Sequence, residues 1–159
     1  MDYTYDEYGG YNTGRLTRVR WNWTLNGSNQ VVACAAPGGG VIGFEETYSY
    51  NAAGRVSTKT LGYTRTSGSQ VKTATLSGDW SYNNEGQLIS VLYPLHREMS
   101  VGDRRQVNYG YDEMARINSV QTKLATENDL TPGYQSVISN VSFNAFGSIA
   151  GLTHLGVSE

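Results

Sequence analysis

Hydrophobic and polar residues alternate along most of this chain with a period of two. Val19, Trp21, Trp23 and Leu25 are separated by arginine, asparagine and threonine. Because side chains two residues apart on a β-strand point to the same face, this run predicts one apolar and one polar face, with all four apolar side chains together. Similar runs recur along the chain. We expect about ten strands, several of ten residues or more, and no helix beyond one short turn at 124–130.

One phrase occurs five times: aromatic, any residue, aromatic, Asp or Asn, two residues, Gly, Arg, aliphatic. Its most complete copy runs from Tyr48 to Val56. Repetition at a period of about 30 residues indicates an array of similar units, so we expect one β-hairpin per copy. The residues that form the repeat are Tyr3, Tyr5, Asp6, Gly14 and Arg15; Tyr48, Tyr50, Asn51, Gly54 and Arg55; Trp80, Tyr82, Asn83 and Gly86; Tyr109, Tyr111, Asp112 and Arg116; and Phe143, Asn144 and Gly147.

The Asp or Asn of each copy is expected to start a turn, because its side chain accepts hydrogen bonds from backbone N–H groups two residues on. The glycine three residues later fits a left-handed residue that closes a type I turn. The first copy carries an insertion, residues 7–13. The fourth copy has Ala115 in place of glycine, which predicts strain there. Aliphatic residues three apart after each turn, such as Leu16 and Val19, predict a β-bulge that returns both to one face.

Composition narrows the function classes. The chain has 12 basic and 14 acidic residues and a net charge of −2, which argues against a nucleic-acid-binding surface. Its one cysteine, Cys34, allows no internal disulfide and is expected to be a small packed residue. No apolar run has the length of a membrane span, and the N-terminus does not resemble a signal peptide. Because the chain opens almost directly on a copy of the repeated phrase, we expect a piece of a longer protein.

Few residues offer catalytic or ligand-binding chemistry. The segment 38–43 spells GxGxxG, but a strand phrase follows it where a nucleotide site needs a helix. His96 and His154 are the two histidines, and neither belongs to a nucleophile motif. The acidic segment 127–129 lacks the ordered spacing of a calcium loop. The sequence predicts no enzyme, no cofactor and no metal site.

The aromatic residues support two interpretations. Trp21, Trp23, Trp80 and the repeat tyrosines could stack on sugar rings, which would make the chain a carbohydrate-binding or cell-surface-binding module. They could instead form cross-strand contacts, each contributing roughly 0.2–1 kcal/mol. Their recurrence at one place per repeat favours the second interpretation.

The repeated phrase resembles the YD repeat of the RHS family, which includes bacterial Rhs proteins, the cocoon-forming subunits of Tc toxins and the teneurins. The resemblance rests on the five copies, best in Tyr48–Val56 and in Tyr3–Leu16 with its insertion, and covers most of the chain. It implies long hairpins arranged side by side in a curled strip, either barrel-like or an open spiral sheet, that encloses a C-terminal toxin or other cargo. The shell-closing phrase with its self-cleavage aspartate is absent, so no protease residues are assigned.

Together these observations predict an all-β, antiparallel array over 1–159 that acts as a non-enzymatic structural scaffold. The expected partners are the remainder of a larger shell and its cargo, or a second copy of the chain through open sheet edges. The resemblance implies a secreted or cell-surface location.

Overall fold

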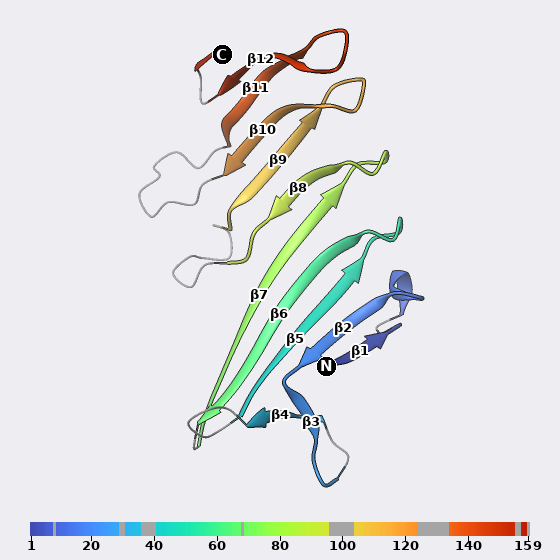
Figure 1. Ribbon diagram of the computed structural model, residues 1–159, viewed down its shortest axis with the longest axis vertical. Coiled ribbons are helices and arrows are strands. Elements are labelled where there is room, and N and C mark those ends of the chain that lie inside the picture. Colours follow the sequence, from blue (N-terminus) through green and yellow to red (C-terminus); the bar gives the residue numbers. More distant parts are fainter. Residues whose placement is uncertain are drawn as a thin grey trace. The chain divides into compact units, whose positions relative to one another are not determined.

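The computed structural model describes residues 1–7, 9–28, 31–35, 41–67, 69–95, 104–123, 134–154 and 157–158. Within them the fold is all-β and antiparallel, with thirteen strands and one short 3-10 helix, so the predicted fold class is confirmed (Figure 1). The elements are β1 (Asp2–Tyr5), η1 (Gly10–Asn12), β2 (Leu16–Trp21), β3 (Trp23–Leu25), β4 (Val31–Ala35), β5 (Val41–Tyr50), β6 (Val56–Ser67), β7 (Gln70–Tyr82), β8 (Leu88–Leu92), β9 (Gln106–Tyr111), β10 (Ile117–Lys123), β11 (Gln135–Phe143), β12 (Ile149–His154) and β13 (Val157–Ser158).

The chain divides into two compact units, Met1–Gly78 and Asp79–Glu159. In the first unit the hydrogen-bonded strand order is β1-β2-β5-β6-β7, while β4 also pairs with β5 and β3 with β4. In the second unit the order is β7-β8-β9-β10-β11-β12-β13. β7 contributes residues to both units. That residues 1–159 act as one array stays a prediction.

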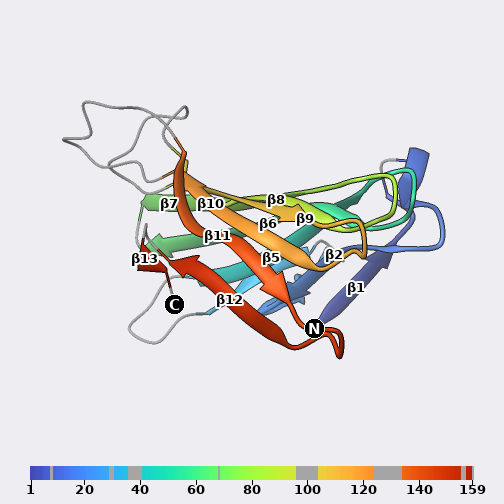
Figure 2. The same ribbon diagram turned by 90° about the horizontal axis from the view of Figure 1, so that it is seen from above.

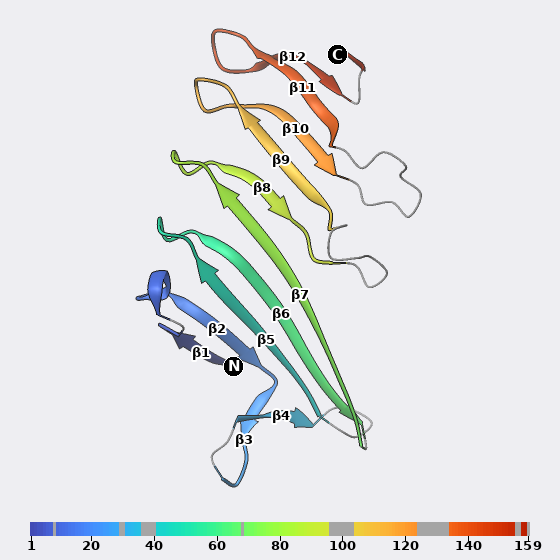
Figure 3. The same ribbon diagram turned by 180° about the vertical axis from the view of Figure 1, so that it is seen from behind.

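The expected long strands are present. β5, β6 and β7 contain 10, 12 and 13 residues, and Figure 3 shows β5 beside β6 along its whole length. The strand count exceeds the expected ten because β3, β4 and β13 are short additional strands. The short helical turn expected at 124–130 lies outside the described residues.

The two faces of the first unit differ in chemistry. One face carries Trp21, Phe44, Tyr48 and Lys59, as the register of β2, β5 and β6 requires. The opposite face carries arginines, glutamates, threonines and serines. Among the described residues the buried apolar side chains are only Val19 and Val91, 7% and 8% exposed. Each unit is therefore built on strand pairing and contacts between hairpins more than on a thick apolar core.

The prediction that Trp23 shares a face with Trp21 is wrong. Asn22 adopts a left-handed conformation with φ 61°, which breaks the alternation between β2 and β3. Trp21 stacks on the Phe44 ring at 5.5 Å between centroids. The Trp23 indole instead lies where a Cβ of the neighbouring Gly43 would point. Because consecutive residues of a strand face opposite sides, the two tryptophans lie on opposite faces of β5 and cannot form one sugar-binding platform.

Candidate functional site

The five repeat phrases adopt closely related hairpin turns. The second aromatic residue ends the incoming strand, the Asp or Asn begins the turn, and the Gly-Arg-aliphatic segment leads into the returning strand. In four copies the backbone carbonyl of the first turn residue accepts a hydrogen bond from the backbone N–H of the residue three further on. These pairs are Asn51 with Gly54, Asn83 with Gly86, Asp112 with Ala115 and Asn144 with Gly147, at 2.9 to 3.0 Å. This is the backbone pattern of a type I turn.

The turn side chains accept hydrogen bonds from the turn backbone. The expected bond from the residue two further on occurs at Asp112 and Asn144, whereas Asn51 and Asn83 accept from the residue four further on. The Oδ1 atom of Asn51 accepts a hydrogen bond from the Arg55 N–H at 3.0 Å, and Asp112 accepts from Met114 and Arg116. The residue at the glycine position is left-handed in all five copies: Gly14, Gly54, Gly86, Ala115 and Gly147, with φ from 64° to 83°. The Arg116 guanidinium, hydrogen-bonded to Asp112, also holds the pKa of that carboxyl below its ordinary value.

The predicted bulge is present in every copy, one residue after each aliphatic residue. Tyr50 pairs with Val56, but Ser49 pairs with Thr58, so Ser57 has no opposite residue. The same register shift occurs in the other four hairpins. The shift explains why aliphatic residues three apart both face the aromatic pair: Leu16 lies opposite Tyr5, and Val19 lies opposite Tyr3.

The first copy departs from the others because of its insertion. Its described residues 9–13 contain η1, which Figure 2 shows near the β5–β6 turn. Asp6 itself is left-handed here, with φ 63°, and accepts a hydrogen bond from the Gly14 N–H. The Asn12 carbonyl accepts a hydrogen bond from the Arg15 N–H at 3.0 Å. Thr13 with φ −56° and ψ 128° and Gly14 with φ 75° make this a type II turn, unlike the turns of the other four copies.

Substituting Ala115 with glycine is expected to raise the free energy of unfolding by up to about 1 kcal/mol, because alanine pays a Cβ penalty at φ 64° that glycine does not. The measurement is a urea or thermal melt of both proteins. The matched control is Ala145→Gly. Ala145 is a turn residue of the fifth copy whose φ is not positive, so glycine there should lower the free energy of unfolding. An Ala115→Gly protein no more stable than the parent would contradict this account of the turn.

Successive hairpins are joined by a recurring contact, which we call the turn–ring contact. The Tyr50 hydroxyl of the second hairpin donates to the Leu16 carbonyl of the first at 2.6 Å. The Arg15 guanidinium of the first hairpin lies 5.5 Å from the centre of the Tyr50 ring. The second aromatic residue of one repeat thus binds the Arg-aliphatic segment of the repeat before it.

The second unit contains the same contact twice, with substitutions. The Tyr111 hydroxyl donates to the Leu88 carbonyl at 2.8 Å, and Gln87, which stands where arginine is usual, reaches the Ala115 carbonyl at 3.3 Å. In the next pair of hairpins Arg116 lies 4.0 Å from the centre of the Phe143 ring, a cation–π arrangement. The motif residues therefore form contacts between hairpins. Those of the third and fourth copies, among them Asn83, Tyr109 and Asp112, also line an open depression of about 500 Å³.

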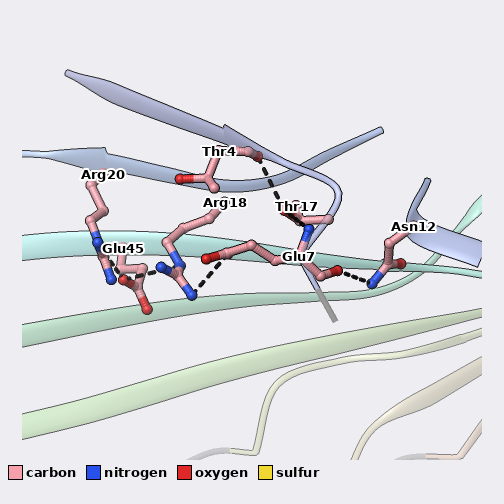
Figure 4. A network of polar contacts seen from close by, with 7 residues as sticks. All are labelled: Thr4, Glu7, Asn12, Thr17, Arg18, Arg20 and Glu45. Atoms are coloured by element: carbon pink, nitrogen blue, oxygen red, sulfur yellow. Dashed lines mark hydrogen bonds and ion pairs between the residues drawn. The ribbon is translucent and has the colours of Figure 1, made fainter. Parts of the chain in front are cut away.

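A chain of charged residues lies on the polar face of the first unit (Figure 4). Arg18 forms ion pairs with Glu7 at 2.8 Å and with Glu45 at 3.5 Å, and Arg20 pairs with Glu45 at 2.5 Å. The bulge residue Thr17 is fully buried, and its hydroxyl donates to the Thr4 carbonyl at 3.1 Å. This network fastens the inserted loop to the sheet. Sequence analysis missed it, since only three-dimensional pairing brings Glu45 beside Arg18.

A second charged group lies on the aromatic face. Glu46 accepts hydrogen bonds from the Tyr48 hydroxyl at 2.5 Å and from Lys59 at 2.8 Å. Partial burial alone would raise the pKa of the Glu46 carboxyl, but the hydrogen bonds from Lys59 and Tyr48 outweigh it, and the pKa lies below its ordinary value of 4.5. The hydrogen bond to Glu46 raises the pKa of Lys59 above 10.5.

These shifts predict a stability plateau at moderate pH. A carboxyl whose folded pKa is depressed stabilises the fold above its unfolded value, so the Glu46 contribution is lost as pH falls below 4.5. Lys59, with a raised pKa, loses its contribution as pH rises above 10.5. Because both side chains are partly exposed, we expect the Glu46–Lys59 pair to contribute about 0.5 kcal/mol to the free energy of unfolding. Urea unfolding midpoints measured across the pH range should fall less at acid pH for Glu46→Gln than for the parent. If the midpoints of the two proteins fall equally with pH, Glu46 is not the group responsible.

The remaining candidate chemistry is sparse. Among the described residues, no three His, Cys, Asp or Glu side chains gather closely enough to hold a metal ion. Gly43, the last glycine of the GxGxxG segment, lies inside β5, so the segment runs into a strand as expected. Cys34 is half-buried in β4, and His154 ends β12. His96 and the acidic segment 127–129 lie outside the described residues. A shallow depression of about 260 Å³ beside Trp23 is lined mainly by glycine and threonine.

Comparison with known proteins leaves the family open. No family model and no curated protein matches the chain. Among solved structures, a porin-like protein from Bacteroides uniformis ATCC 8492 aligns over 86% of this chain at 13% identity, with a TM-score of 0.28. The chain spans about half of that protein, 53%, and a score this low carries no argument about fold or function. In the part of the chain that the structure describes, no helix is long and apolar enough to cross a membrane.

Proposed function

We propose that this chain is a structural wall segment of the RHS/YD-repeat type, which helps to enclose a C-terminal toxin or other cargo and has no catalytic role of its own. The observation that carries the proposal is the turn–ring contact. It uses the aromatic, Arg and aliphatic positions of the repeated phrase to join one hairpin to the next, in Tyr50 with Leu16 and again in Tyr111 with Leu88. A secreted or cell-surface location is part of this proposal.

The chemistry of the two faces supports the same role. Aromatic and aliphatic side chains hold neighbouring hairpins together on one side, while paired charges and hydroxyls such as Arg18, Glu45 and Thr60 occupy the other. A wall that lines a protein compartment needs a surface to which cargo does not adhere through exposed apolar patches. The polar face consists mainly of charged and hydroxyl-bearing side chains, and the Trp23 indole on it is half-buried over Gly43.

Protection of cargo from protease tests the proposal. The full natural polypeptide that contains residues 1–159 is treated with protease, and survival of its C-terminal portion is followed by mass spectrometry. We expect protection in the parent, and loss of protection when Tyr50→Ala and Tyr111→Ala weaken the wall. The control is Phe146→Ser, a turn residue that is 96% exposed and should leave protection unchanged. A C-terminal portion digested as quickly as in the heat-unfolded protein would refute enclosure.

A further inference from the structure

The turn that joins β3 to β4 contains the one Asn-Gly pair of the sequence, Asn26 with Gly27. Asn26 is half-buried, and Gly27 and Ser28 are exposed. The Ser28 N–H donates a hydrogen bond to the Oδ1 atom of Asn26 at 2.9 Å. This Asx turn folds the side-chain amide of Asn26 back toward the backbone that follows it, where the Gly27 nitrogen lies.

Gly27 leaves the approach to the Asn26 amide carbon open. It has no side chain of its own, and a Cβ added there would meet no atom within 4 Å. Its φ is not positive, so alanine can adopt the same backbone conformation. A side chain beside the backbone nitrogen would hinder that nitrogen from reaching the amide carbon. Glycine after asparagine is therefore the residue that permits their close approach best.

We propose that Asn26 is a site of spontaneous deamidation in the folded protein. Hydroxide from solvent removes the Gly27 N–H proton, and the Gly27 nitrogen forms a bond to the Asn26 Cγ. The bond from Cγ to the side-chain nitrogen then breaks, water returns a proton to that nitrogen, and ammonia leaves. Water opens the resulting cyclic imide to aspartate or to isoaspartate. The net change is gain of water and loss of ammonia, and nothing is oxidised or reduced.

The Ser28 N–H assists the first step. Negative charge develops on the Asn26 Oδ1 atom as the Gly27 nitrogen attacks, and the Ser28 N–H already donates to that oxygen. A donor aimed at an atom on which charge develops lowers the barrier. The modification goes beyond the proposed function, because it requires neither cargo nor shell. It adds a negative charge to the β3–β4 turn, next to the strand that holds the Trp23 indole over Gly43.

Asn144 in the fifth repeat provides an internal comparison. Its Oδ1 atom accepts a hydrogen bond from the Phe146 N–H, two residues on, at the same 2.9 Å, and a second one from the Ser148 N–H at 3.1 Å. The residue after it is Ala145 rather than glycine. Asn144 therefore shares the assisting hydrogen bond but not the unhindered nitrogen. We expect Asn144 to stay intact while Asn26 deamidates.

Peptide mapping by mass spectrometry, after incubation of the folded protein in neutral buffer, tests the proposal. Asn26 should be converted to a mixture of aspartate and isoaspartate, and Asn144 should not. Gly27→Ala, shown by a thermal melt to be folded, should slow the conversion about tenfold, which corresponds to a barrier higher by about 1.4 kcal/mol. Conversion of Asn26 no faster than that of Asn144, or equally fast in Gly27→Ala and the parent, would overturn the proposal.

A second variant transfers the site to the fifth repeat. Ala145→Gly creates a new Asn-Gly pair beneath the hydrogen bond from Phe146. Asn144 should then deamidate about tenfold faster than in the parent, while Asn26 of the same protein deamidates at its parental rate. The unchanged rate at Asn26 shows that the variant is not altered throughout. An Asn144 that stays intact in Ala145→Gly would refute the role given to the glycine.

Discussion

Gly43→Ala is expected to lower the free energy of unfolding by about 2 kcal/mol, as for an overpacked interior site. A Cβ at Gly43 would lie 2.6 Å from Cε2 of the Trp23 indole and 2.8 Å from the Cβ of Ala33. Neither neighbour can move freely. The indole N–H donates to the Phe44 carbonyl at 2.7 Å, and β5 is paired on both sides. The added methyl group must therefore displace Trp23 or distort the sheet.

The matched control is Gly62→Ala, a glycine of the adjacent strand whose added Cβ would meet only the Glu45 carbonyl oxygen at 3.8 Å. That variant should be neutral or slightly more stable, since alanine loses less chain entropy than glycine on folding. Urea unfolding followed by tryptophan fluorescence compares the two. Trp23→Leu in the Gly43→Ala background should recover part of the loss, because a smaller side chain leaves room for the methyl group. Equal stability of Gly43→Ala and the parent would contradict this packing.

Local features of the fold were predictable from the sequence. The turn at Asn51 to Gly54 depends on a side chain that bonds its own backbone and on a residue that tolerates positive φ, and both requirements are visible within four residues. The bulge was predictable too. Leu16 and Val19 are three residues apart, so both side chains can lie on one face of the sheet only if an extra residue is inserted between them. Ala115 shows how strongly the turn is specified, because the left-handed conformation persists without glycine.

Features set by distant contacts were not predictable. In the sequence, Trp23 continues the alternation of β2. In the structure, the left-handed conformation of Asn22 places the Trp23 side chain on the other face. The Asn22 carbonyl accepts a hydrogen bond from the Cys34 N–H of β4 at 2.7 Å. Asparagine tolerates positive φ, but nothing local requires it there. Likewise, Gly43 belongs to a formal GxGxxG motif although its role is to admit the Trp23 indole.

The partners of the turn–ring contact could not be predicted from the sequence. The tyrosine hydroxyl binds a backbone carbonyl, such as that of Leu16, and every residue has a backbone carbonyl. The phrase showed that arginine and tyrosine recur, and cross-strand contact was the favoured interpretation. Only the structure shows that Tyr50 contacts the arginine and the aliphatic residue of the preceding copy rather than its own. The repeat is therefore best understood as an interface between neighbouring units, each unit supplying both halves.

Tyr50→Ala should lower the free energy of unfolding by about 3 kcal/mol, near the lower end of the cost of deleting a buried aromatic side chain, because this ring is half-buried. The substitution removes the hydrogen bond to the Leu16 carbonyl, the cation–π contact with Arg15 and the ring that packs opposite Val56. Tyr50→Phe isolates the hydrogen bond and should cost about 1 kcal/mol. Arg15→Ala isolates the cation and should cost about 0.5–1 kcal/mol.

Tyr5→Ala provides the matched control. It deletes the same side chain at the same repeat position, but Tyr5 is 57% exposed and its strand β1 pairs only with β2 among the described residues. Its loss should stay within the 0.2–1 kcal/mol of a cross-strand pair. If Tyr5→Ala and Tyr50→Ala cost the same, the ring would matter only within its own hairpin. A large difference would place the stabilisation between hairpins, because that contact is what distinguishes the two positions.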